Sequence, residues 1–160
     1  DMYYFINDIT GYRLNVVDAA CGSRFYNFEK TKDGGTTWTE VNGDPFEQNM
    51  GVAEGLLFFT NDFGFAGLTY ASEDFSMLYV TKDGGETFER LELPLDTVTE
   101  LPSEAEELGF TIEDYDYHTM PQIVDGKMEI YLQTDAMEQQ GIIFQSEDNG
   151  VTWEYAGCKE

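Results

Sequence analysis

Basic residues are scarce in this chain. Only 8 lysines and arginines stand against 32 aspartates and glutamates among its 160 residues, which gives a formal net charge of −24 at pH 7. Proteins that bind nucleic acid or anionic membranes need cations to neutralise phosphates, so the scarcity excludes both as partners. Two interpretations of the charge remain: solubility, or attraction of cations and basic partners.

Cysteines and long apolar runs are also few. Cys21 and Cys158 are the only cysteines, and their separation matches no metal-ligand spacing; they are consistent with one disulfide or with two free thiols. No segment approaches the ~20 apolar residues of a membrane helix, so we expect no membrane insertion. The chain starts at Asp1 without an initiator Met or a signal-like segment, which predicts a processed or truncated product.

One eight-residue pattern occurs three times. The segments Thr31–Trp38, Thr81–Phe88 and Ser146–Trp153 all read Thr/Ser-x-Asp-x-Gly-x-Thr-aromatic. An alternating hydrophobic run precedes each copy and a shorter one follows it, which predicts a strand, a turn and a strand. The shared residues that we assign to the turn are Thr31, Asp33, Gly35 and Trp38, then Thr81, Asp83, Gly85 and Phe88, then Ser146, Asp148, Gly150 and Trp153.

The residue types explain the turn without a ligand. The Asp carboxylate is expected to accept hydrogen bonds from backbone N–H groups one to three residues later, and from the Thr or Ser hydroxyl two residues earlier. The Gly supplies a position where φ is positive. The aromatic residue starts the next strand and tucks beneath the turn. The pattern therefore predicts a hairpin fastener.

These segments resemble the Asp-box, or BNR repeat, of sialidases and of other β-propellers such as sortilin-like receptors. The resemblance covers the three hairpins directly. It implies an all-β fold of four-stranded antiparallel β-propeller blades, in which the Asp-boxes lie opposite the face that carries most sites. It also implies a secreted or cell-surface protein.

The repeat predicts one domain over residues 1–160, with blades at about 2–41, 55–93 and 120–156 and an insertion at 94–119. Within the insertion, the sequence from Ser103 to Glu106 has the form of a capping box, so a short helix is expected near 103–108, ending before Gly109. The first strand of the third blade is expected at Met120–Val124.

Three blades do not close a propeller, which needs roughly 4–8. The chain is therefore expected to be a segment of a longer propeller, half of a six-bladed homodimer, or an irregular compact packing. The two cysteines approach each other only if the third blade meets the first.

The face opposite the Asp-boxes is formed by the connections within and between blades, and it is acidic. Its candidate ligand residues are Arg24, Asp74, Glu113, Asp114, Tyr115, Asp116, Tyr117, His118 and Asp135. Three interpretations of the 113–118 segment compete: a solvated acidic loop, a Ca²⁺ site without the usual Asp-x-Asp-x-Asp-Gly pattern, and paired carboxylates for glycoside hydrolysis. Tyr115 and Tyr117 are candidates for stacking on a sugar or a peptide.

A sialidase site requires three inward arginines, and the chain has three in total. Arg13 and Arg90 are expected at the wrong face or radius, and only Arg24 borders the candidate face. We therefore assign no catalytic residue and no metal ligand. The sequence favours a non-catalytic scaffold or binding module for a carbohydrate or protein ligand. The alternative is part of a sialidase-like glycoside hydrolase whose other blades lie outside this chain.

Overall fold

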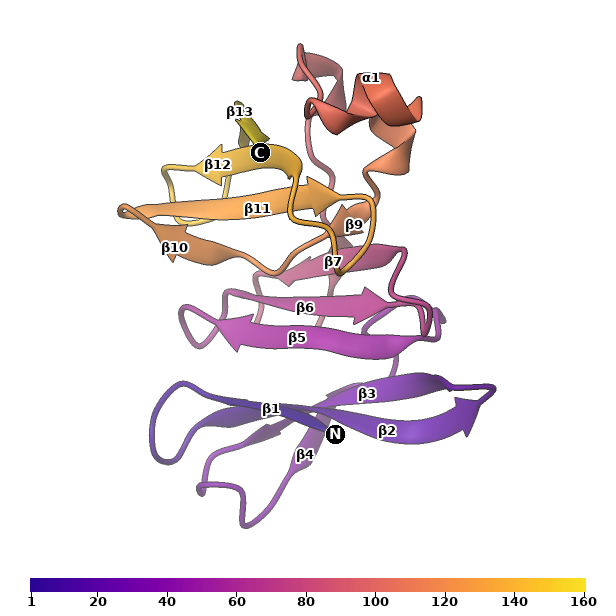
Figure 1. Ribbon diagram of the computed structural model, residues 1–160. Helices are drawn as coiled ribbons and strands as arrows, with labels where there is room; N and C mark the ends of the chain where they lie inside the picture. The colour runs from indigo at the N-terminus through magenta and orange to yellow at the C-terminus, as the bar shows by residue number, and fades with distance from the viewer. The chain divides into compact units, whose positions relative to one another are not determined.

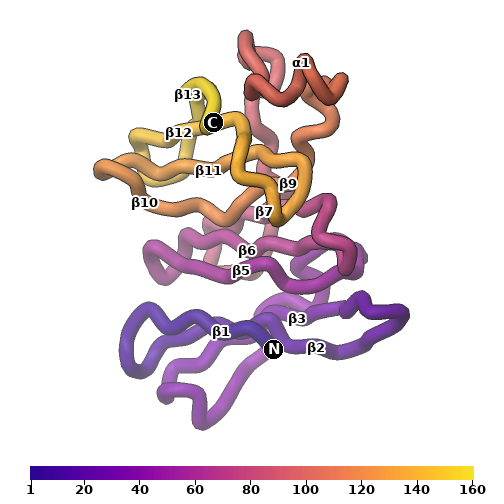
Figure 2. Tube along the Cα trace, viewed as in Figure 1, coloured from indigo at the N-terminus to yellow at the C-terminus, as the bar shows by residue number.

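The structure is a computed structural model that describes residues 1–160, and it consists of three separate antiparallel sheets (Figures 1 and 2). The first sheet contains β1 (Met2–Phe5), β2 (Gly11–Ala20), β3 (Ser23–Thr31) and β4 (Thr39–Asn42). The second contains β5 (Val52–Phe58), β6 (Gly64–Thr69), β7 (Ser76–Thr81) and β8 (Glu89–Arg90). The third contains β9 (Tyr117–His118), β10 (Gln122–Val124), β11 (Lys127–Gln133), β12 (Gly141–Ser146) and β13 (Glu154–Lys159).

The all-β prediction is confirmed. Strands β1 to β8 and β10 to β13 lie side by side in chain order within their sheets, as consecutive hairpins require. Each of the three predicted strand groups forms one sheet. No sheet closes on itself, and the assignment of the sheets as propeller blades stays a prediction.

The chain divides into two compact units. Unit 1 comprises Asp1–Ala71 and Met77–Leu91, and unit 2 comprises Ser72–Ser76 and Glu92–Glu160. Unit 1 thus holds the first two sheets, and unit 2 holds the third sheet with the insertion before it.

Aromatic side chains join the two sheets of unit 1. Tyr12 of β2 stacks on Phe58 of β5 with ring centroids 3.7 Å apart, and Phe28 of β3 stacks on the same ring at 5.8 Å. Phe88, which directly precedes β8, packs edge-on against Phe28 with ring centroids 5.1 Å apart. Tyr12, Phe28 and Phe58 are at most 1% exposed. Because side chains alternate along a strand, the neighbours of these residues project from the opposite face of the first sheet.

The first strand of the third sheet is interrupted, which corrects the prediction of one strand at Met120–Val124. β9 pairs with the end of β11 at Leu132 and Gln133, whereas β10 pairs with its beginning. Pro121 lies between them and has no N–H to donate to the ladder. Thr119 keeps the interrupted segment bonded to β11. Its backbone N–H donates to the Tyr131 carbonyl, and its hydroxyl accepts the Tyr131 N–H.

The insertion contains η1 (Leu95–Thr97), α1 (Glu104–Leu108) and η2 (Ile112–Asp114). The helix predicted near 103–108 is present and ends at Gly109 in the left-handed conformation, with φ +74°. The predicted capping box at Ser103 is wrong. The Ser103 hydroxyl donates instead to the carboxylate of Glu160 at 2.7 Å. A capping box does occur at η2, between Thr111 and Asp114.

The helices are short as well as few. None of them has the length and apolar character that would let it cross a membrane.

Candidate functional site

The three repeated segments form nearly identical turns, which we call the repeat turns (Thr31–Trp38, Thr81–Phe88 and Ser146–Trp153). In the first, the Thr31 hydroxyl donates to Asp33 Oδ1 at 2.7 Å, as predicted, and accepts the N–H of Gly35 at 2.9 Å. The N–H of Thr37 donates to Asp33 Oδ1 at 2.8 Å and the Thr37 hydroxyl donates to Oδ2. The principal backbone donor therefore lies four residues after the Asp, one further than expected.

These hydrogen bonds favour the ionised carboxylate. The hydroxyl and N–H of Thr37 and the hydroxyl of Thr31 lower the pKa of Asp33 to about 2, and the equivalent bonds from Thr152 and Ser146 lower that of Asp148 to about 2. At Asp83 burial opposes the shift, but bonds from Thr87 and Thr81 still lower the pKa. The turn carboxylates are therefore committed to the fold.

The backbone of each turn has two consecutive residues with positive φ. The predicted position is confirmed at Gly35, Gly85 and Gly150, with φ of +94°, +94° and +92°. The preceding residue was not predicted, and it is Gly34, Gly84 or Asn149. Among residues other than Gly, Asn is one of those most often found in the left-handed region. The Asn at position 149 could therefore have indicated this conformation from the sequence.

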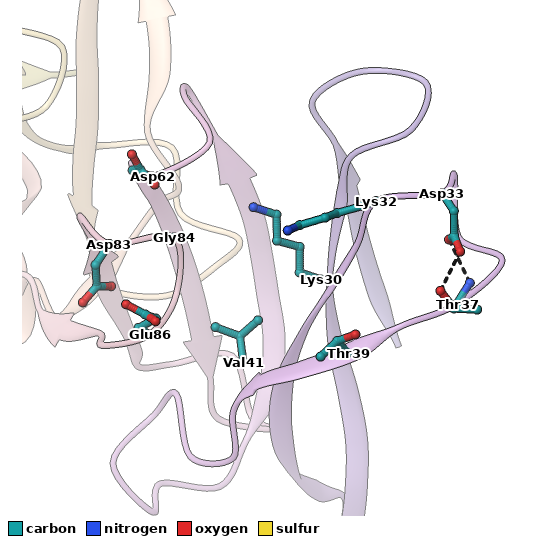
Figure 3. Close-up of a pocket in the computed structure, with 10 residues that line it drawn as sticks. All are labelled: Lys30, Lys32, Asp33, Thr37, Thr39, Val41, Asp62, Asp83, Gly84 and Glu86. Carbon is teal, nitrogen blue, oxygen red and sulfur yellow. Dashed lines mark hydrogen bonds between the residues drawn. The ribbon is translucent and has the colours of Figure 1, made fainter.

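A cavity of about 600 Å³ lies beside the first two repeat turns, wholly within unit 1 (Figure 3). Its lining residues are Lys30, Lys32, Asp33, Thr37, Thr39, Val41, Asp62, Asp83, Gly84 and Glu86. Figure 3 shows the Lys30 and Lys32 ammonium groups pointing from the first sheet toward the side that carries Asp62, Asp83 and Glu86. The two lysines thus face three carboxylates across the cavity, while the Asp33 carboxylate on the lysine side is bound by Thr37.

The ammonium groups of Lys30 and Lys32 have no carboxylate partner in the protein. Neither ammonium group takes part in a salt bridge, unlike the cationic groups of Arg13 and Lys127. Lys30 Nζ lies 5.5 Å from the centre of the buried Tyr12 ring, whose hydroxyl donates to the Asn61 carbonyl at 2.9 Å. The cation–π contact positions the Lys30 ammonium without neutralising it.

The predicted acidic residues gather in unit 2. The negative charges of Asp74 and Asp114 act on Asp116, whose pKa is raised first by burial and then by these charges. Asp74 accepts the Ser72 hydroxyl, and Asp135 accepts the N–H groups of Met137 and Glu138. Glu113 and Asp114 accept the Thr111 hydroxyl. Nowhere do three or more His, Cys, Asp or Glu side chains gather in a way that would hold a metal ion.

The expectation that Tyr115 and Tyr117 stack on a ligand is wrong. Tyr115 is 2% exposed and Tyr117 is 8% exposed. Tyr115 donates its hydroxyl to Glu104 at 3.1 Å and packs edge-on against Phe110. Burial and the neighbouring Glu104 raise its pKa. His118 lies in β9, where its N–H donates to the Ser76 hydroxyl and its carbonyl accepts from that hydroxyl. Tyr115 and Tyr117 therefore belong to the core, and the backbone of His118 is held in the strand.

Arg24 lies in unit 1, where its backbone pairs with Gly51 in an isolated bridge. Both cysteines are free thiols, and the Cys158 thiol donates to the carbonyl of Glu100 at 3.3 Å. Sequence reasoning missed the lysine cavity, although Lys30 and Lys32 flank Thr31 in a chain with few cations.

No protein-family model matches this chain, and no curated protein matches it.

Proposed function

We propose that the chain is a non-catalytic binding module of the Asp-box type, and that its ligand occupies the lysine cavity of unit 1. The observation that supports this most directly is the pair of unpaired ammonium groups facing carboxylates across a cavity of about 600 Å³. Ligand cavities in proteins commonly have volumes of 300–1,000 Å³.

The two sides of the cavity define the chemistry of the ligand. Lys30 and Lys32 favour a carboxylate or another anionic group, whereas Asp62 and Glu86 accept hydrogen bonds from hydroxyl, amide or ammonium groups. A ligand that carries both kinds of group matches the cavity. Acidic oligosaccharides and peptides with mixed charges share this chemistry.

The contacts of Arg13 support a binding role over the glycosidase alternative. The Arg13 guanidinium donates three hydrogen bonds to the Glu29 carboxylate, at 2.9 to 3.1 Å, and covers the Trp38 ring at 4.5 Å. These contacts favour a structural role for Arg13. Of three arginines, at least this one is committed to the fold.

Binding is tested by ¹⁵N–¹H spectra of the full chain during titration with hexagalacturonate and, separately, with an alternating Glu-Lys octapeptide. The expected result is a saturable shift of signals around Lys30, Lys32 and Glu86 with one of the two probes. The double variant Lys30→Gln/Lys32→Gln should lose it. The control Lys127→Gln, which removes a lysine of unit 2, should retain it. Shifts that persist in the double variant, or no shift with either probe, would overturn the proposal.

A further inference from the structure

The face of the first sheet opposite Tyr12 and Phe28 carries an ordered row of side chains. Tyr3 of β1 pairs with Arg13 of β2, Arg13 pairs with Glu29 of β3, and Glu29 pairs with Glu40 of β4. Directly paired residues of antiparallel strands project from the same face. The row therefore crosses all four strands on one side of the sheet, which we call the open face.

Three aromatic rings stand beside this row. Tyr3 is 51% exposed and Phe5 is 42% exposed. Their ring centroids lie 5.7 Å and 6.0 Å from that of the half-buried Trp38. A Cβ atom at Gly11 would lie 2.6 Å from the Phe5 ring, and one at Gly35 would lie 3.5 Å from it. Because neither glycine has a side chain, the Phe5 ring packs directly against the backbone at both positions, which restricts its orientation.

The repeat shows that this face is not built like the others. Two and four residues before the first hydroxyl of each repeat turn, the second sheet has Tyr79 and Met77 and the third has Phe144 and Ile142, all at most 4% exposed. The first sheet has Glu29 and Asn27 at these positions. A face made to receive another sheet needs apolar residues there, so the open face is adapted to polar contacts.

Several polar groups of the open face lack partners within the protein. The indole N–H of Trp153 donates to the Gly150 carbonyl at 3.2 Å, whereas that of Trp38, at the same place in the repeat, donates to no protein atom. The half-buried Asn15, which pairs with Asn27, makes no side-chain hydrogen bond. Asn27 donates to Glu40 at 2.7 Å, but its carbonyl oxygen has no partner.

We propose that the open face is a binding surface for neutral carbohydrate, centred on the exposed rings of Tyr3 and Phe5. Trp38 lies beside them and offers its edge, because the Arg13 guanidinium covers its ring at 4.5 Å. A pyranose ring has an apolar C–H face, which suits exposed aromatic rings, and hydroxyl groups at its edge, which suit the Trp38 N–H and the Asn15 amide. The Glu29 carboxylate is paired with Arg13, but Glu40 is exposed on the same face and disfavours anionic sugars there.

Trp38 reports on this surface directly. The chain has two tryptophans, and replacing Trp153 by Phe leaves Trp38 as the sole indole; Phe is the natural residue at the equivalent position 88. The full-length Trp153→Phe protein is titrated with cellohexaose, laminarihexaose, xylohexaose and mannohexaose while the emission of Trp38 is recorded. We expect a saturable change with at least one of them.

Matched variants locate the binding. In the same background, Tyr3→Ala should weaken the affinity about tenfold, because an exposed aromatic anchor is lost from an edge strand with little effect on folding. Tyr70→Ala removes another exposed tyrosine, at 46%, and should bind normally. The Lys30→Gln/Lys32→Gln variant should also bind the sugar normally. The proposals for the open face and for the lysine cavity can therefore be refuted independently of each other.

Three results would overturn the proposal. The first is no saturable change with any of the four sugars up to about 10 mM, where affinity is too weak to count as recognition. The second is a change that Tyr3→Ala leaves intact. The third is a Tyr3-dependent change with decaproline and none with the sugars, which would assign the face to proline-rich peptides.

Discussion

Gly85 lies directly against the ring of Phe28. A Cβ atom at Gly85 would lie 2.5 Å from Cδ2 and 2.9 Å from Cζ of that ring, and closer still to Cε2. The two residues are 57 positions apart by number, in the second repeat turn and in β3. The repeat turn therefore closes the hairpin between β7 and β8 and, at the same time, packs the second sheet onto the first within unit 1.

Gly85→Ala is expected to lower the free energy of unfolding by about 3 kcal/mol. A positive φ at a non-Gly residue costs about 1–2 kcal/mol, and overpacking against a fixed core ring adds about 1–3 kcal/mol. Urea unfolding followed by circular dichroism measures the change.

Gly126→Ala provides the control for backbone strain alone. Gly126 has φ +79°, but a Cβ atom there would have no heavy atom within 4 Å. It should cost only about 1 kcal/mol. Equal losses in the two variants would show that the contact with Phe28 does not matter.

The turn carboxylates predict a loss of stability in acid. The pKa of Asp33 is about 2 in the folded protein, below the ordinary value of 3.8. Its stabilising effect is therefore complete above about pH 4 and disappears as the pH falls toward 2. Accordingly, Asp33→Asn should be less stable than the unmodified protein at pH 6, and the difference should shrink between pH 4 and pH 2.

Unfolding in urea at pH 6, 4, 3 and 2 measures this difference. Asp96→Asn serves as the control, since Asp96 is exposed and its carboxylate accepts no hydrogen bond. It should follow the unmodified protein at every pH. A constant difference between Asp33→Asn and the unmodified protein down to pH 2 would contradict the assignment.

The sequence predicted those features that depend on neighbouring residues. The hydroxyl–carboxylate bond of Thr31 with Asp33 and the positive φ of Gly35 are local, so the residue types sufficed. The capping box predicted at Ser103 was wrong because the hydroxyl bonds to Glu160, which lies 57 residues away. Tyr115 misled for a similar reason, because packing against Phe110 buries a side chain that stands in an acidic segment.

The lysine cavity and the open face could not be predicted without the pairing register of the strands. Lys30 and Glu29 are adjacent in sequence and project from opposite faces of the first sheet. Only the pairing of β2 with β3 and the packing of Phe28 on Phe58 show which face is covered. Alternation predicts that two faces exist, and it does not say what lies on each.

The third repeat turn offers a test of backbone conformation. Asn149 has φ +60° where the other turns have Gly34 and Gly84. Asn149→Gly should change the free energy of unfolding by less than about 0.5 kcal/mol, whereas Asn149→Ala should cost about 1 kcal/mol, because Ala tolerates the left-handed region poorly. Thermal unfolding of both variants measures this. An Ala variant as stable as the Gly variant would contradict the assigned conformation.

The hydrogen bond between Tyr115 and Glu104 is expected to stabilise the insertion of unit 2. The Tyr115 hydroxyl donates to Glu104 Oε1 at 3.1 Å, and burial, only partly offset by this bond, raises the pKa of Glu104. Tyr115→Phe leaves the carboxylate without this donor, so at pH 7 it should cost about 1–2 kcal/mol. Tyr3→Phe, which removes a hydroxyl from an exposed ring, should cost less than about 0.5 kcal/mol. In a double-mutant cycle with Glu104→Gln, the coupling between Tyr115 and Glu104 should be about 1 kcal/mol. If Tyr115→Phe were as stable as Tyr3→Phe, the hydrogen bond from the Tyr115 hydroxyl to Glu104 would not contribute to stability, which would contradict the prediction.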